Sequence, residues 1–207
     1  MAIGSEHKER TRARILEEAA RAMRERGHEG IGVADLMKRA GLTHGGFYKQ
    51  FRSKADLMAA SAACGIAQTA ALSAGVDPAV FARHYLSRQH RDARAAGCTM
   101  AALGADAARQ PEPVRATFAA GIEQLLAALT PADGATNGAD ADRRRADALD
   151  LLAHVVGAVV LSRACPDDAP LADEILSVCR DRVLAALAPA STPPIAPARD
   201  AAPPATA

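Results

Sequence analysis

Seven residues near position 50 form a pattern suited to contact with a nucleic acid. They are Thr43, His44, Gly45, Gly46, Tyr48, Lys49 and Lys54. Their hydroxyl, imidazole, phenol and ammonium groups can donate hydrogen bonds to base edges and phosphate oxygens. The adjacent glycines each cost a helix interior roughly 1 kcal/mol, yet they offer a bare backbone that a base or phosphate can approach closely. The alternative is that the glycines extend a turn and the helix begins after them.

Two short helices joined by a tight turn must position these residues. Apolar residues recur at helical spacing over 33–40, Gly41 predicts a stop, and a second short helix is expected over 43–50, capped by Thr43. These are the dimensions of a helix-turn-helix, whose second helix enters the major groove of DNA. The spacing therefore favours a DNA-binding unit.

The aromatic residues of the second helix divide between two faces. Phe47 and Phe51 are four positions apart and are expected to share a face. We assign that face to a small core shared with residues of the two preceding helices: Ile15, Ala19, Leu36 and Met37. His44 and Tyr48 are also four apart, on a second face that is free to meet DNA.

The rest of the chain is predicted to be helical as well. A first helix begins at Thr11 and ends near Gly27, and Ser53 with Asp56 resembles a capping box at the start of a long helix. Further helices are expected over 53–74, 78–96, 99–109, 113–129, 143–163 and 170–187. The fold class is thus all-α: a three-helix helix-turn-helix domain (1–52), a larger helical effector-binding and dimerisation domain (53–188), and a Pro/Ala-rich tail (189–207) expected to be disordered.

Charge and composition limit the classes of function. The formal net charge is +1, but residues 1–54 hold 12 Lys and Arg against 7 Asp and Glu, net +5, and the remainder holds 13 against 17, net −4. The positive end suits a polyanion, although a solvated charged face explains it equally well. Four scattered cysteines and the lack of a secretory signal or of an apolar run of roughly 20 residues indicate a cytoplasmic protein without a membrane span.

Lys54 stands in the first turn of a predicted helix, where a cation opposes the helix dipole by a few tenths of a kcal/mol. A DNA phosphate at that helix start would make the lysine stabilising there, because the free backbone N–H groups and the lysine would both bind the phosphate. Lys49 and the Tyr48 phenol are expected to be further backbone contacts. The basic residues of the first helix either touch flanking phosphates or form a solvated helix start: Lys8, Arg10, Arg12 and Arg14.

The segment from TRARILEEAARAM to AGLTHGGFYKQFRSKADLMAAS resembles the DNA-binding domain of TetR/AcrR-family transcriptional regulators. The resemblance is specific over about residues 10–60 and weak elsewhere. It implies a homodimer that binds a palindromic operator, usually as a repressor, and leaves it when a small-molecule effector enters the C-terminal body. By position it assigns DNA contact to Thr43, Gly45, Tyr48 and Lys54. Gly32 departs from the Ser or Thr cap of many relatives, at a small cost.

Helices 143–163 and 170–187 resemble the family's dimerisation pair. Their apolar faces comprise Leu149, Leu152, Ala153, Val156, Val159 and Val160 on the first, with Gly157 and Ala158 allowing close approach, and Leu171, Ile175, Val178, Cys179 and Leu187 on the second. Two chains could join these faces into a four-helix interface. Periodicity leaves an ordinary intrachain core open as the alternative.

Effector recognition has the weakest signal in the sequence. Phe81, Tyr85 and Phe118 are the body's aromatic residues, and Cys98 stands at the start of a predicted helix. The GC start before a small-residue helix resembles family members that sense electrophiles, quinones and drug-like aromatics. A buried structural cysteine is the alternative.

No cofactor or metal is expected, because His84, His90 and His154 lack a completing ligand at suitable spacing. No motif indicates an enzyme. Three other classes of protein stay open: an activator of the same fold, a sequence-indifferent DNA-coating protein, and a helical enzyme that uses Cys98 with a histidine.

Overall fold

The apolar periodicity folds into helices throughout the part of the chain that the computed structural model describes, residues 2–30, 32–130 and 138–188, and no strand occurs in those ranges. The all-α prediction is confirmed. In chain order the helices are α1 (Ala2–Arg26), α2 (Val33–Arg39), the 3₁₀ helix η1 (His44–Lys49), α3 (Lys54–Ser73), α4 (Pro78–Tyr85), α5 (Arg88–Asp92), the 3₁₀ helix η2 (Arg94–Ala96), α6 (Thr99–Ala107), α7 (Glu112–Leu129), α8 (Gly138–Ala164) and α9 (Pro170–Leu187).

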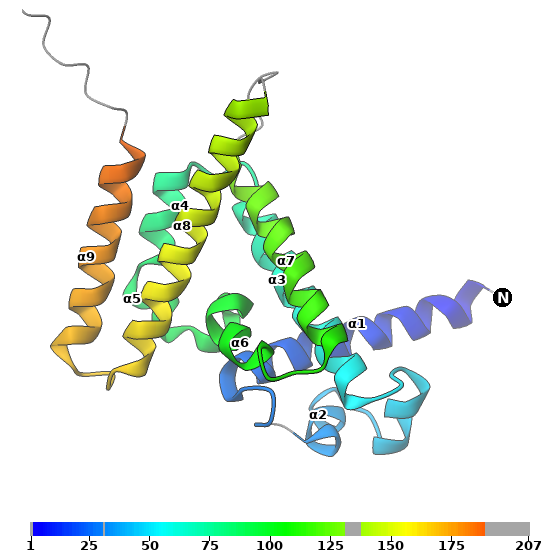
Figure 1. Ribbon diagram of the computed structural model, residues 1–207. Helices are drawn as coiled ribbons and strands as arrows, with labels where there is room; N and C mark the ends of the chain where they lie inside the picture. The colour runs from blue at the N-terminus through cyan, green and yellow to red at the C-terminus, as the bar shows by residue number, and fades with distance from the viewer. Residues whose placement is uncertain (1, 31, 131–137, 189–207) are drawn as a thin grey trace, which may run out of the picture.

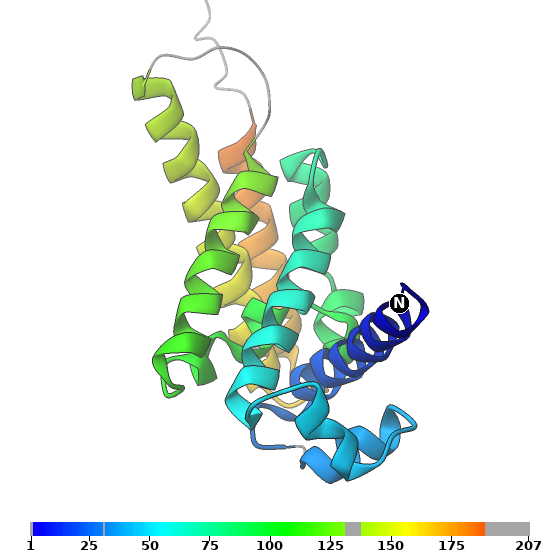
Figure 2. The ribbon, with the colours of Figure 1, turned by 90° about the vertical axis from the view of Figure 1, so that its right-hand side faces the viewer.

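The helices form a small N-terminal unit at one end of a larger body (Figure 1). In the body, α3 packs along α7, and α8 pairs with α9, as both views show (Figure 2). The N-terminal unit consists of α1, α2 and η1. Helix α6 contacts α1 as well as α3, α7 and α8, so it connects the unit to the body.

Local signals explain most helix ends. Gly27 and Gly41 have φ values of +78° and +69°, which favour glycine, and they follow α1 and α2 as predicted. Ser53 caps α3, since its Oγ accepts a hydrogen bond from the Asp56 N–H at 3.1 Å. The Asp56 carboxylate in turn accepts from the Arg52 N–H at 3.0 Å, and this backbone hydrogen bond lowers the Asp56 pKa. The predicted capping pair is therefore present.

Four details of the predicted helices are wrong; one is that α8 begins at Gly138 instead of residue 143. Helix α1 begins at Ala2 instead of Thr11, because nothing upstream breaks it and Glu6 pairs with Arg10 at 2.8 Å. The segment 78–96 is three short helices, since the Ser87 hydroxyl accepts from the His90 N–H and starts α5 anew. The second helix of the motif is a 3₁₀ helix.

The predicted core of the N-terminal unit is confirmed. Its six residues are each at most 2% exposed: Ile15, Ala19, Leu36, Met37, Phe47 and Phe51. The rings of Phe47 and Phe51 stack with centroids 5.7 Å apart. The Arg12 guanidinium lies over the Phe51 ring, 4.3 Å from its centroid, and donates to the Gln50 carbonyl, so this half-buried arginine helps to stabilise the unit.

Two further points concern the predicted tail and the predicted lack of a membrane span. The tail 189–207 and part of the 130–142 break lie outside the described residues. Helix α3 is long and apolar enough, by length and composition alone, to cross a membrane, which the sequence reading did not foresee. A core helix of a soluble protein passes the same test, and α3 packs against α1, α6 and α7.

Candidate nucleic-acid interface

The turn between α2 and η1 sets the direction of the candidate recognition segment. The Leu42 N–H donates to the Met37 carbonyl at 2.8 Å, and the Gly41 N–H donates to the Lys38 carbonyl at 3.0 Å. This pair of bonds is a Schellman motif, in which glycine takes the left-handed position. The motif reverses the chain within a few residues and presents η1 beside α2.

One face of η1 is buried and the other is open. Phe47 fills the core, whereas Tyr48, its neighbour in sequence, is 69% exposed. The His44 ring lies edge-on to Tyr48, with centroids 6.1 Å apart. Thr43 and Lys49 are exposed on the same segment. The structure therefore leaves all four predicted groups exposed on one short segment and places the imidazole of His44 beside the phenol of Tyr48.

Thr43 does not cap the helix as predicted. It occupies the N-cap position of η1 with extended backbone, but its side chain accepts no capping hydrogen bond. Its Oγ1 lies 3.9 Å from the place where a Cβ on Gly46 would stand. The hydroxyl is thus available for an external partner.

The chain's own packing does not require a glycine at position 45. A Cβ added to Gly45 meets nothing within 4 Å, and one added to Gly46 meets the Met37 methyl at an ordinary 3.5 Å. Neither residue is among the positive-φ glycines of the described chain. Space and backbone conformation inside the protein would both accept alanine, which leaves an outside contact as a reason for the glycine pair.

Lys54 lies at the first position of α3, beside the N-terminal unit. Its Nζ contacts the Glu29 Oε2 at 3.1 Å, and the Glu29 side chain is 83% exposed. An exposed pair of this kind is worth about 0–1 kcal/mol. A phosphate can therefore replace Glu29 as the partner of Lys54 at little cost.

The four predicted sensing residues do not form one site. Phe81, Tyr85 and Cys98 gather around His90: the Tyr85 ring lies 5.2 Å from Phe81 and 4.3 Å from His90 between centroids. Phe118 instead packs edge-on to His28, with centroids 6.3 Å apart, near the end of α1. All four are buried.

Polar groups surround Cys98 in this cluster. His90 Nδ1 contacts the Tyr85 carbonyl at 2.8 Å and its Nε2 accepts from the Cys98 N–H at 3.3 Å, which places the proton on Nδ1. Burial lowers the pKa of His90 to about 4. Burial also raises the pKa of the Tyr85 phenol well above its ordinary value, and the Cys98 thiol adds to that shift.

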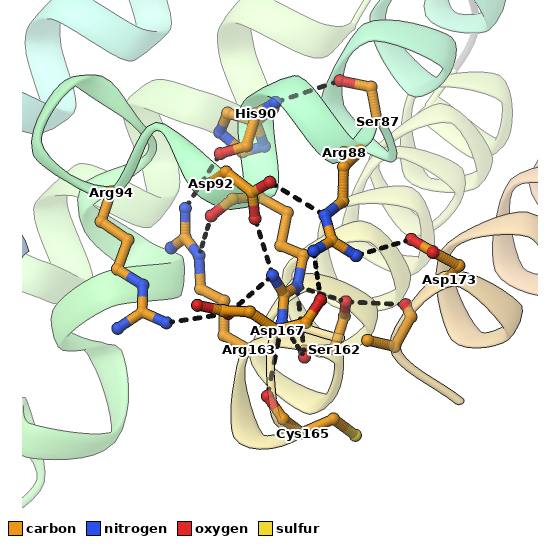
Figure 3. Close-up of polar contacts among 12 residues, drawn as sticks. Ser87, Arg88, His90, Asp92, Arg94, Ser162, Arg163, Cys165, Asp167 and Asp173 are labelled. Atoms are coloured by element: carbon orange, nitrogen blue, oxygen red, sulfur yellow. Dashed lines mark hydrogen bonds and ion pairs between the residues drawn. The ribbon is translucent and has the colours of Figure 1, made fainter. Parts of the chain in front are cut away.

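A buried arginine at the other side of this cluster was missed by sequence reasoning. Arg91 is 1% exposed; its Nε donates to the Ser162 Oγ at 3.0 Å and its Nη1 contacts Asp167 at 3.0 Å. Arg163 returns from α8 and donates to the Arg91 carbonyl at 2.9 Å. These bonds join α5 to the turn between α8 and α9 (Figure 3). In the sequence, Arg91 is one of several arginines in a charged run, and nothing marks it as buried.

Helices α8 and α9 divide their predicted apolar faces between the inside and the outside. Among these residues, Leu152, Ala158 and Val159 are buried in the chain's own core, as the intrachain alternative expected. The exposed ones are Leu149, Ala153, Val160, Leu171, Val178 and Leu187. An apolar cavity of about 210 Å³ lies between α6, α7 and α8 and is lined by Met100, Gly104, Ile122, Leu149, Leu152, Ala153 and Val156. None of the four predicted sensing residues lines it.

The family model for bacterial regulatory proteins of the tetR family matches residues 15–61, from the middle of α1 into α3. This segment is thus similar to the DNA-binding domain of that family. The match confirms the resemblance inferred from the sequence, and both α2 and η1 lie within the matched residues. The comparison with curated proteins gives no match.

Solved structures of tetR-family regulators share the fold over most of the chain. Reduced NemR from E. coli superposes with a TM-score of 0.64 at 19% identity, covering 84% of this chain and 94% of that one. A TetR-family regulator from Cytophaga hutchinsonii gives 0.63 at 18% identity, covering 86% and 96%. AibR, in complex with isovaleryl coenzyme A and operator DNA, gives 0.50 at 17% identity, covering 84% and 97%. The chain thus has the fold of tetR-family DNA-binding transcriptional regulators.

Within the described residues, no group of three or more His, Cys, Asp and Glu side chains could hold a metal ion. His84 and His90 lie 6.2 Å apart between ring centroids. Both ring nitrogens of His90 are engaged by backbone groups, which leaves it no lone pair for a metal.

Proposed function

We propose that this protein is a cytoplasmic, dimeric repressor that binds a palindromic operator and leaves it when a small molecule enters the body. The observation that carries the proposal is the open face of η1, where donors surround a glycine whose Cβ position is empty. Because no side chain stands at this exposed position, the backbone there can be approached closely by a DNA edge.

Some of these residues are proposed to bind the DNA backbone, and others to contact the bases. Lys54, Lys49 and the Tyr48 phenol bind phosphates and fix the unit on the duplex. His44 and the Thr43 hydroxyl reach base edges from the start of η1, where Gly45 lets the backbone come close. Most of the affinity is then electrostatic and falls as salt rises. The preference among sequences depends on the few groups at the start of η1.

The outer face of α8 and α9 is proposed as the dimer interface. Leu171 and Val178 are 54% and 51% exposed, and Leu161 is 59% exposed on the neighbouring helix. Large apolar side chains at such exposure are stabilised when a second chain covers them. A symmetric pair would present two copies of η1 to two half-sites of one operator.

The apolar cavity between α6, α7 and α8 is proposed as the effector site. Its lining is almost wholly hydrocarbon, which favours an apolar or aromatic part of a ligand. Helix α6 contributes Met100 and Gly104 to the cavity and also packs against α1. A ligand that binds better when α6 is shifted would displace α1 and change the spacing of the two recognition segments. The equilibrium between the two states would shift by the difference in the ligand's binding free energy for them. The AibR complex supports the idea that this fold can hold both a ligand and DNA.

Cys98 is a second candidate sensor, but its burial limits the access of an electrophile to the thiol. Cys98 is 3% exposed, so an electrophile reaches it only after local opening. If Cys98 is the sensor, Cys98→Ser keeps its operator affinity at an oxidant dose that releases the wild type. Equal release of both proteins would exclude this role and leave a structural cysteine.

The test of the proposed function is a titration against DNA upstream of the protein's own gene and against random duplex of equal length, at several salt concentrations. A sequence-specific regulator binds the first at least about 10³-fold more tightly, and the ratio persists as salt rises. Equal affinity for both would favour a sequence-indifferent DNA-coating protein. Transcription measured with the same promoter separates repression from activation.

A further inference from the structure

A cavity lined by three arginines lies where the N-terminal unit meets the body. It measures about 280 Å³, and its charged lining residues are Arg24, Arg94, Arg163 and Glu25. They come from α1, η2 and α8; the remaining lining residues are small or apolar: Gly27, Ala101, Ala102, Val160 and Ala164. Cations thus outnumber anions on its wall.

Arg24 is buried without a counter-ion. It is 8% exposed, its Nε donates to the Ala95 carbonyl at 2.8 Å, and its Nη1 donates to the Thr99 hydroxyl at 3.4 Å. No carboxylate of the described chain lies within ion-pair distance of it. A Cβ on Gly65 would stand 2.6 Å from Nη1, so the fold keeps a glycine where the guanidinium passes α3. Buried charges are normally paired, which makes this one unusual.

Arg163 is half-buried and also lacks a carboxylate partner among the described residues. Its Nε and Nη2 donate to the carbonyls of Arg91 and His90 at 2.9 and 3.1 Å. Desolvation lowers the pKa of Arg163, as it does for Arg24, which is the mark of a cation whose charge is incompletely compensated.

The other charges near the cavity do not cancel these two. Arg94 lies 3.7 Å from Asp167, a carboxylate that Arg91 already holds at 3.0 Å (Figure 3). Glu25 contacts Arg26 at 3.7 Å. The C-terminal ends of α1 and α8 each add about half a negative charge. Together with Glu25 they offset about two of the three guanidinium charges, so a net positive charge is left on the lining.

We propose that this cavity binds a small oxyanion, through a carboxylate or phosphate group, between α1 and the body. Guanidinium groups match both oxyanions with paired N–H donors, and hydrogen bonds between charged groups are stronger than neutral ones. The volume is at the small end of ligand sites, which are about 300–1,000 Å³, so the ligand is a compact anion. This differs from the apolar cavity in both place and chemistry.

The position of the site gives the anion a consequence that rests on the proposed function. Arg24 belongs to α1 of the DNA-binding unit, whereas Arg163 belongs to α8 of the body. An anion held by both ties the two parts in one orientation. Operator affinity then depends on anion concentration. It rises with the anion if that orientation fits the operator and falls if it does not.

Calorimetry and thermal unfolding of the full chain without DNA test the site itself. The probes are inorganic phosphate and acetate, with chloride at equal ionic strength as the reference. The variants are Arg94→Gln and Arg163→Gln, and the matched control is Arg143→Gln, an exposed arginine elsewhere on α8. Arg94 is about half exposed, so its replacement leaves the fold intact even if Arg163→Gln unfolds.

We expect saturable binding of at least one probe by the wild type and by Arg143→Gln, and binding roughly tenfold weaker or more in the two cavity variants. No saturation at about 10 mM, or equal affinity in all four proteins, would overturn the proposal and leave the arginines as caps of backbone carbonyls. Because no DNA is present, failure of the proposed function does not affect this result. A parallel operator titration with and without the bound probe tests the coupling, and an unchanged affinity would refute that step alone.

Discussion

Gly45→Ala separates a role in DNA contact from a role in folding. The new Cβ meets nothing within 4 Å, and the backbone of Gly45 is not in the left-handed region. Alanine lowers the entropy of the unfolded chain, so we expect stability to rise by about 0.4–1 kcal/mol. For a chain of this size that raises Tm by roughly 1–4 °C. On DNA the same methyl stands between the backbone and the base edges, and we expect operator affinity to fall by about tenfold or more, which is roughly 1.4 kcal/mol.

The assay pairs urea unfolding with fluorescence anisotropy on an operator fragment at fixed salt. Gly138→Ala is the matched control, because a Cβ there also meets open space but lies at the start of α8 in the body. It should gain stability similarly and bind DNA like the wild type. If Gly45→Ala is more stable and binds the operator with wild-type affinity, the glycine does not face DNA and our reasoning about η1 is refuted.

Four further predictions address the phosphate contact, the neutral histidine, the dimer and the thiol. Lys54→Gln weakens binding to all DNA sequences about equally and lowers the salt slope by about one per bound subunit; an unchanged slope contradicts the phosphate role. His90, whose folded pKa of about 4 lies below its ordinary 6.5, contributes stability that is fully present above pH 6.5 and is lost as pH falls to about 4. That loss is about 3 kcal/mol by urea unfolding, and His90→Gln should flatten the profile there. Val178→Asp yields monomers by light scattering and weakens operator binding, whereas Val80→Asp, equally exposed on α4, does neither. Cys98→Ser resists oxidant release of the operator only if that thiol is the sensor.

Much of the fold was readable because its signals are local. Gly27 and Gly41 follow helices in the left-handed conformation that glycine favours, and the Ser53 cap makes its predicted bond. The core of the N-terminal unit followed from helical spacing, since Phe47 and Phe51 stack within it. The helix-turn-helix was therefore predictable in position and in its buried face.

What the sequence could not supply depends on long-range contacts. Arg91 can be buried because Ser162 and Asp167, 71 and 76 residues away in the sequence, accept hydrogen bonds from its guanidinium. Phe118 was grouped with Cys98 by residue type, but the fold packs it against His28. Periodicity identified the apolar faces of α8 and α9 without deciding which of them a partner covers. Each of these outcomes needs the tertiary arrangement.

The central claim is that η1 enters the major groove of a specific operator. Dimethyl sulfate footprinting tests it directly, because the reagent methylates guanine N7 in that groove. Our account predicts protected guanines in two symmetric half-sites, with centres about 10 base pairs or a multiple apart, and loss of that protection in Gly45→Ala. Binding to the same fragment with every guanine N7 still reactive would contradict it.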